Sequence, residues 1–392
     1  NEKEPKVEHK KFNQKFGLCH TLLLVGAWSQ AKETMDKLPK FAAVSEQPVV
    51  EAMCKLIHVL IEPIYRQYSS KAARGRPYPY KLSTGPEQCK VFGDLTDCVF
   101  PLLFNLGPYL SFDPILMAKV IRVGRTFLKE NPNVTGQDKD VKLLAVWNGL
   151  IELVDQVLFP SLSLLECNPS IAEEVWILLK AFPYNIRYCL YGRWKNQSYN
   201  LHPKLIDARA KTIKKAKYIA KRLSKENVKQ SGRQIGKLSH SNPGVLFEYI
   251  LSQIQKYDNF IGPVVDSLKY LTPMSYDVLA YCIIEALANP EKERLKLDDT
   301  NISEWLKSST LCWGNNVNSS YRFYEHGLHL GLPASGNKKC HLAHDETEIM
   351  LKAHYAVVDG TGRKATWDGA QFGFLASHIV QVPCKRIAIW VR

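Results

Sequence analysis

The sequence contains no close pair of cysteines, although it has ten cysteines in 392 residues. Scattered cysteines in a chain of this length are typical of reduced thiols in the cytosol or nucleus, and they argue against a disulfide framework. No uninterrupted apolar run reaches the roughly 18 residues that span a bilayer, so we expect no membrane partner. The charged start, NEKEPKVEHKK, has neither the apolar core of a signal peptide nor an initiating Met, which favours a fragment or a processed product.

A complete phosphate-binding loop is also missing. The stretch SGRQIGKLSHSNP, residues 231–243, has a lysine after its second glycine. A Walker loop needs four residues between its glycines and a hydroxyl after the lysine, whereas this stretch has three residues and Leu238. We therefore interpret it as a connector between helices, with glycine supplying left-handed backbone. Ser241 or Asn242 is then expected to cap the next helix, with Pro243 in its first turn.

Catalytic and metal motifs are equally scarce. No G-x-S-x-G nucleophile elbow frames any serine, and Glu173 and Glu174 are better explained by a favourable position at a helix start. Cysteines and histidines gather in the tail, but without the disciplined spacing of a structural zinc site; they are Cys312, His326, His329, Cys340, His341 and His344. We expect no metal, no cofactor and no enzymatic activity; the alternative is a catalytic site assembled in space from residues that are far apart in the sequence.

What the sequence does contain is helical periodicity. Apolar residues recur every three or four positions through most of the first 300 residues, and few stretches alternate as strands do. We expect helices at residues 12–38, 49–68, 95–107, 113–130, 141–162, 171–182, 184–196, 244–257, 261–271 and 276–288. Pro63 should end or kink its helix, and Asp113 should cap the helix that Pro114 begins. The pattern predicts an all-α fold, a helical-repeat or α-solenoid array without a fixed repeat length.

Positive charge is concentrated in one segment. Residues 204–237 hold twelve Lys/Arg against two acids, whereas the whole chain has a net charge of +14. Placed on one helix, Ile206, Ala210, Ile213, Ala216, Ala220 and Leu223 lie on one side, with a row of cations opposite and Tyr218 among them. Such a row attracts nucleic-acid phosphates without reading sequence; a protein contact and a merely solvated face are the alternatives. The candidate nucleic-acid-binding residues are Lys211, Lys214, Lys215, Lys221, Arg222, Lys225, Lys229, Arg233 and Lys237.

The strings KRLSKENVKQSGRQIGKLSHSNPGVLFEYILSQIQKYDNF and FPYNIRYCLYGRWKNQSYN, together with LGPYLSFDPILMAKVIRVGR, resemble subunit 2 of the THO complex. The resemblance runs over about residues 7–307. It implies a non-enzymatic helical scaffold in the nucleus that acts in mRNA processing and export. The implied partners are other THO subunits, a DEAD-box RNA helicase and mRNA.

The resemblance also implies a domain organisation. Residues 1–203 correspond to the N-terminal scaffold, 204–238 to a basic helix and connector, and 239–307 to the start of a MIF4G-like helical domain. Residues 308–392 no longer resemble the family, and we expect a weakly folded or irregular tail from an alternative exon or from read-through. A truncated product without helicase engagement and a direct RNA-binding helical module are therefore the alternatives to a complete scaffold.

Overall fold

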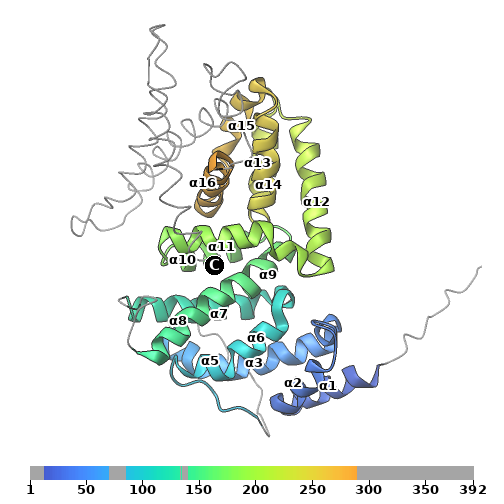
Figure 1. Ribbon diagram of the computed structural model, residues 1–392, viewed down its shortest axis with the longest axis vertical. Helices are drawn as coiled ribbons and strands as arrows, with labels where there is room; N and C mark the ends of the chain where they lie inside the picture. Colours follow the sequence, from blue (N-terminus) through green and yellow to red (C-terminus); the bar gives the residue numbers. More distant parts are fainter. Residues whose placement is uncertain (1–12, 70–84, 133, 135–139, 289–392) are drawn as a thin grey trace, which may run out of the picture. The chain divides into compact units, whose positions relative to one another are not determined.

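All regular secondary structure of the described residues is helical. The computed structural model describes residues 13–69, 85–132, 134 and 140–288, and these residues form α-helices, 3-10 turns and a π-helical turn without any strand (Figure 1). The all-α prediction is confirmed for these residues. The expected irregular tail, 308–392, and its cluster of cysteines and histidines lie outside them.

The helices divide between two compact units, which meet in the sequence at Phe182 and Pro183. The first unit contains α1 (Gln14–Val25), α2 (Trp28–Asp36), η1 (Ala43–Ser45), α3 (Gln47–Tyr68), α5 (Asp94–Cys98), α6 (Phe100–Leu106), η2 (Gly107–Phe112), α7 (Pro114–Glu130), α8 (Val141–Leu153), η3 (Val154–Leu158), α9 (Phe159–Leu164) and α10 (Pro169–Leu179). The second contains α11 (Tyr184–Asn196), η4 (Ser198–Asn200), α12 (Pro203–Ala220), α13 (Val228–Ser239), α14 (Pro243–Ile254), η5 (Asp258–Phe260), α15 (Ile261–Leu268) and α16 (Pro273–Ala288).

The helix expected over residues 12–38 is two helices, because Gly26 ends the first of them. Gly26 has a φ of 84°, a left-handed conformation that costs glycine little. Its backbone N–H and that of Ala27 donate to carbonyls in the last turn of α1, as in a Schellman cap. The chain therefore turns sharply before α2, although the apolar periodicity continues across the break.

Helix α3 is the central helix of the first unit and packs against α1, α6 and α7. Pro63 was expected to end or kink this helix; it does not end it, because the helix continues to Tyr68. Proline has no N–H for the carbonyl one turn earlier. That carbonyl, of Val59, accepts a hydrogen bond from the side-chain amide of Gln88 at 2.9 Å, and the adjacent Leu60 carbonyl accepts one from the backbone N–H of Cys89 at 2.9 Å. The segment that precedes α5 thus satisfies the carbonyl that proline leaves without a helical donor.

Asp113 caps α7 as expected, with Pro114 as the first helical residue. Its Oδ1 accepts hydrogen bonds from the backbone N–H groups of Ile115 and Leu116, and its Oδ2 lies 3.0 Å from Nε2 of the buried His58 on α3. Burial raises the pKa of Asp113, but the hydrogen bonds from His58, Leu116 and Ile115 outweigh it and lower the pKa below its ordinary value. The cap therefore also joins α7 to α3.

One long apolar helical stretch among the described residues is Val141–Leu164, which comprises α8, η3 and α9. By length and composition alone it could cross a membrane, with a mean hydropathy of 1.3 in its best window. It also supplies core residues of the first unit, including the fully buried Val154, Val157, Leu158, Phe159 and Leu162. The core helix of a globular protein meets the same criteria, so this stretch is weak evidence for a membrane span.

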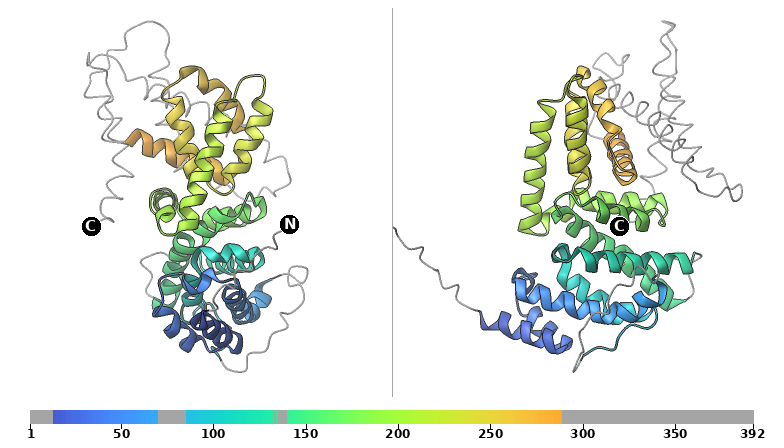
Figure 2. Two further views of the ribbon diagram at one scale, coloured as in Figure 1. Left: turned by 90° about the vertical axis from the view of Figure 1, so that its right-hand side faces the viewer. Right: turned by 180° about the vertical axis from the view of Figure 1, so that it is seen from behind.

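The second unit has two layers of helices. In one layer α14 packs against both α12 and α16, and in the other α13 packs against α15 (Figures 1 and 2). Helix α11 contacts α14 and α16. Successive helices therefore alternate between the layers, with α12, α14 and α16 in one and α13 and α15 in the other.

Ion pairs attach α11 to α16. Arg187 Nε lies 2.9 Å from Asp277 Oδ2, which also accepts a hydrogen bond from the Tyr191 hydroxyl at 2.8 Å. Lys195 Nζ lies 2.5 Å from Glu285 Oε2 and 3.3 Å from Glu248 Oε1. These cations are largely buried, and a buried charge is tolerated only when a partner compensates its lost hydration. Arg187 and Lys195 therefore hold the helices of the second unit together.

Gly232 and Gly236 are not in a connector, as the sequence suggested, but inside α13. Neither has a left-handed backbone. Both are buried where α13 meets Tyr270, just after α15. A Cβ on Gly232 would lie 2.4 Å from Cδ2 of the Tyr270 ring, and one on Gly236 would lie 2.6 Å from the Tyr270 backbone oxygen. These glycines are needed for close packing rather than for a turn.

At the next helix, α14, Asn242 holds the N-cap position before Pro243, but its side chain makes no capping hydrogen bond.

Replacing Gly236 by alanine is expected to destabilise the protein. Alanine is the better helix former by about 1 kcal/mol, but its methyl group would meet a backbone oxygen that cannot rotate away, and overpacking typically costs about 1–3 kcal/mol. Gly262→Ala in α15 is the matched control, because nothing lies within 4 Å of the added Cβ. Urea unfolding should show a lower midpoint for Gly236→Ala and an unchanged or higher one for Gly262→Ala. Equal midpoints for the two variants would contradict the packing argument.

Asp113→Asn should cost stability in a pH-dependent manner. Because the pKa of Asp113 is lowered in the folded state, its charge stabilises the fold above the unfolded pKa of about 3.9, and this stabilisation disappears as the pH falls through the folded-state value. The difference in unfolding free energy between parent and variant should therefore be largest near neutral pH and shrink below about pH 4.

The control for this series is Asp140→Asn, which removes the charge of another N-cap, on α8, whose side chain accepts hydrogen bonds from the backbone amides of Lys142 and Leu143 in the capping turn. A parent-to-variant difference for Asp113→Asn that stays constant down to acidic pH would refute the role of its charge.

Candidate nucleic-acid interface

The basic segment folds as two helices joined by a turn. Helix α12 ends at Ala220 and α13 begins at Val228, so a single helix through Lys225 is not formed. Asn227 organises the turn: its Oδ1 accepts from the backbone N–H of Ser224 at 2.9 Å, and its side-chain amide donates to the Arg222 carbonyl. Because the turn interrupts the helix, Lys221, Arg222 and Lys225 lie on the turn between two rows of cations.

The buried face of α12 differs from the expected one. Leu205, Thr212, Ala216 and Ile219 are buried, whereas Ile206 is 54% exposed and Ala210 is exposed. The expected apolar side included Ile206 and Ala210 because it was chosen by residue type alone. The observed face is rotated toward Leu205, and the polar Thr212 fits it because its hydroxyl donates to the Ala208 carbonyl at 2.8 Å.

All nine candidate cations are exposed. Lys211 Nζ forms an ion pair with Asp207 at 2.7 Å, and the guanidinium carbon of Arg222 lies 3.7 Å from the centre of the Tyr218 ring. The remaining candidates form no ion pair with any described residue; they are Lys214, Lys215, Lys221, Lys225, Lys229, Arg233 and Lys237. Arg209 differs from them, since it is half-buried and its Nη2 lies 3.8 Å from Glu248.

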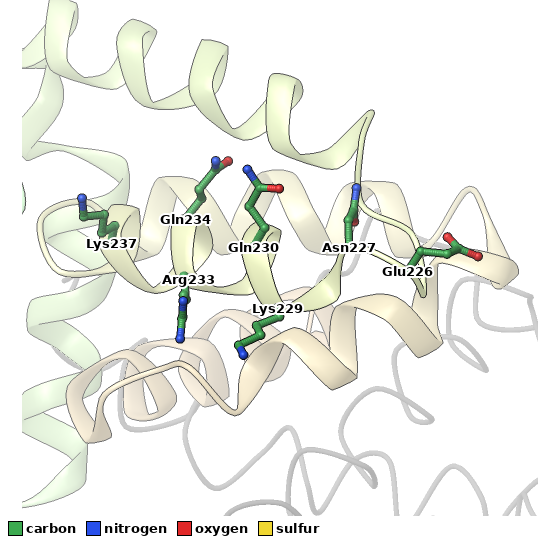
Figure 3. Close-up of a pocket in the computed structure, with 7 residues that line it drawn as sticks. All are labelled: Glu226, Asn227, Lys229, Gln230, Arg233, Gln234 and Lys237. Carbon is green, nitrogen blue, oxygen red and sulfur yellow. The ribbon is translucent and has the colours of Figure 1, made fainter.

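Helix α13 presents three of these cations in a regular row. Lys229, Arg233 and Lys237 follow one another every four residues, a rise of about 6 Å per step, because Val228, Ser231, Gly232, Ile235, Gly236 and Ser239 occupy the buried face. With Glu226, Asn227, Gln230 and Gln234 they line an open hollow of about 540 Å³. Figure 3 shows Lys229 and Arg233 on one side of α13 and Gln230 and Gln234 on the other.

The electrostatics of this hollow favour an anion. Helix α13 contains no acidic residue, and Lys229 lies in its first turn, where the helix dipole is already positive. A cation in that position opposes the helix dipole and destabilises the start of the helix. Glu226 is the one acid lining the hollow, and a hydrogen bond from the Ser224 hydroxyl is the main cause that lowers its pKa. Phosphate groups would meet closely spaced cations together with amide groups that can donate or accept.

Several charged side chains outside the hollow form ion pairs within the first unit. Glu174, which the sequence placed at a helix start, binds Arg122 with its Oε1 at 2.5 Å from Nη2. Glu62 binds Arg66 and Lys119. No group of three His, Cys, Asp or Glu side chains that could hold a metal occurs in the part of the chain that the structure describes. Its cysteines are free thiols, and Cys19, Cys54, Cys89 and Cys282 are buried.

Sequence reasoning missed Gln230 and Gln234. Both are uncharged, so a search for clustered cations passes over them. The signal that could have identified them is the buried face of α13: once the glycines are assigned to the interior, positions 229, 230, 233, 234 and 237 must face outward.

Two family models match the chain. The N-terminal model of THO complex subunit 2 covers residues 82–233, and a model described as a transcription- and export-related complex subunit covers residues 235–309. The first match ends and the second begins within α13. The second ends within two residues of Lys307, where the resemblance was expected to stop.

Curated relatives give the same result. THO complex subunit 2 of Mus musculus is 56% identical over 308 residues, which are 78% of this chain and 19% of the relative. The Homo sapiens protein is 56% identical over 305 residues, with 77% and 19% covered. The Arabidopsis thaliana protein is 34% identical over 331 residues, with 80% and 18% covered. The chain spans about a fifth of the length of these relatives. It is therefore a homologue of THO complex subunit 2 and carries part of that protein's N-terminal portion.

Proposed function

We propose that this chain is a non-enzymatic scaffold subunit of the THO complex that acts in mRNA processing and nuclear mRNA export. The homology to THO complex subunit 2 is the observation that carries the proposal. The implied partners are other THO subunits, a DEAD-box RNA helicase and mRNA, and the implied location is the nucleus.

The architecture of the second unit supports a scaffold. Its helices alternate between two layers, the arrangement of an α-solenoid, in which each helix pair contacts its neighbours and leaves long faces for partners. We propose that residues 1–203 form the scaffold portion and 204–238 the basic portion. Residues 239–307 would begin a MIF4G-like domain, to which α14, α15 and α16 belong. Residues 308–392 do not resemble the family, so a truncated product without helicase engagement is the alternative to a complete scaffold.

A specific observation favours direct RNA contact as a second function. Nine exposed cations lie on α12, α13 and their turn, and an exposed tyrosine, Tyr218, lies among them. Cations track the phosphate backbone, and aromatic rings offer a surface on which single-stranded bases stack. The two functions are compatible, because a scaffold can hold its partners on one face and RNA on another.

Tagged chain incubated with nuclear extract should recover other THO subunits. The scaffold proposal expects this recovery to survive RNase treatment, because protein surfaces hold the subunits together. The variant with Lys229, Arg233 and Lys237 changed to Glu should recover them equally well. Recovery of no THO subunit, or recovery that RNase abolishes, would argue against a scaffold role.

RNA binding should depend on the row of cations in α13. Affinity for a single-stranded oligonucleotide falls with salt by a slope of about −0.7 per phosphate neutralised. Changing Lys229, Arg233 and Lys237 to Glu should therefore make the slope shallower by about 2 and weaken binding by roughly 100-fold at about 0.1 M salt. Fluorescence anisotropy across a salt series measures both quantities.

The matched control changes three exposed lysines of the first unit, Lys32, Lys129 and Lys142, to Glu, which alters the net charge equally. A purely global charge effect would weaken binding to the same extent in both variants. Direct contact by α13 is rejected in that case, and also if the parent protein does not bind RNA at all.

A further inference from the structure

Three serines of the basic segment follow a cation by two positions: Ser224 follows Arg222, Ser231 follows Lys229 and Ser239 follows Lys237. The structure separates them. Ser231 is 6% exposed on the buried face of α13, and Ser239 is 0% exposed and donates to the Gly236 carbonyl at 2.8 Å. Ser224 is partly exposed in the turn between α12 and α13. Of the three serines, Ser224 is the one that both follows cations in the sequence and lies outside a helix.

The surroundings of Ser224 suit an enzyme that approaches from solvent. Lys221 and Arg222, three and two positions before it, are exposed, as is Lys225 after it. Its backbone N–H is held by Asn227, whereas its hydroxyl bonds the carboxylate of Glu226, which is fully exposed. Separating this surface hydrogen bond costs little, because water replaces it.

We infer that Ser224 is a phosphorylation site for a serine kinase whose substrate groove is acidic, and that the phosphate controls the basic surface of α12 and α13. The inference rests on the proposed RNA contact. Kinases of this class select substrates by cations that precede the serine. In the reaction the Ser224 oxygen attacks the γ-phosphorus of ATP and the bond to the bridging oxygen of ADP breaks. The hydroxyl proton passes to the base of the kinase.

The negative charge of phosphorylated Ser224 determines the effect on RNA binding. A phosphoserine carries about −1.5 to −2 charges at neutral pH and offers three acceptor oxygens. It would stand beside Lys221, Arg222 and Lys225 and compete with RNA phosphates for them. The hydrogen bond that the Ser224 hydroxyl donates to Glu226 would be lost, and two anionic groups would face each other there. The turn would then carry negative charge in the middle of a surface that is otherwise cationic.

The first experiment treats the full 392-residue chain with ATP and the catalytic subunit of cAMP-dependent protein kinase, followed by phosphosite mapping by mass spectrometry. We expect phosphate on Ser224 and none on Ser231 or Ser239 in the folded protein. Arg222→Ala, which keeps the hydroxyl and removes a preceding cation, should lower the rate of incorporation by at least tenfold. Absence of phosphate from Ser224, or equal labelling of the three serines in folded protein, would overturn the inference.

The second experiment measures RNA binding by the phosphorylated chain. Neutralising about two cations should make the salt slope shallower by about 1.4 and weaken binding by roughly 20-fold at about 0.1 M salt. Ser224→Ala should bind as the parent does and be unaffected by kinase treatment. Unchanged affinity after complete phosphorylation would overturn the control of RNA binding. If the unmodified parent binds no RNA, the proposed RNA contact fails, while the mapping still decides whether Ser224 is the modified residue.

Discussion

The close contact between α13 and Tyr270 determines the character of the basic surface. Two glycines one helical turn apart let the helix approach the backbone and ring of Tyr270 without a clash. This contact fixes which face of α13 is buried, and the opposite face, with Lys229, Arg233 and Lys237, must then be exposed. The position of the cations is thus a consequence of packing on the other side of the helix. A larger residue at Gly236 would disturb both faces together.

The cations of this chain belong to two classes with different physics. Arg187 and Lys195 are largely buried, and their carboxylate partners on α16 compensate their lost hydration. The cations of α13 are exposed and form no ion pair with a described residue, so their charge extends into solvent, where salt screens it. The sum of charges over the chain therefore says little about anion binding. What matters is how much positive charge remains uncompensated at one surface, and in the second unit this is the surface of α12, α13 and their turn.

Much of the fold could be predicted from the sequence, because local signals specify it. Asp113 followed by Pro114 is sufficient to place the start of α7, and apolar periodicity locates most helices. The failures involve residues whose role depends on distant partners. Gly232 and Gly236 were assigned to a connector, since a glycine pattern does not distinguish a turn from close packing. Pro63 was expected to end or kink its helix; the helix continues through it, and the Gln88 side chain that satisfies the Val59 carbonyl is 29 residues away. The nine cations were found from charge alone, but the rotation of α12 and the glutamines of α13 required the buried faces.

Lys229 at the start of α13 couples two properties of the second unit. A cation in the first turn opposes the helix dipole, so without an anion the beginning of α13 is less stable than its sequence otherwise permits. Any anion that settles there removes this penalty, and by linkage the free energy it gains is also gained by the ordered helix. Helix α13 packs against α12, α14 and α15. Binding of an anion beside Lys229 therefore also stabilises the ordered packing of both helix layers.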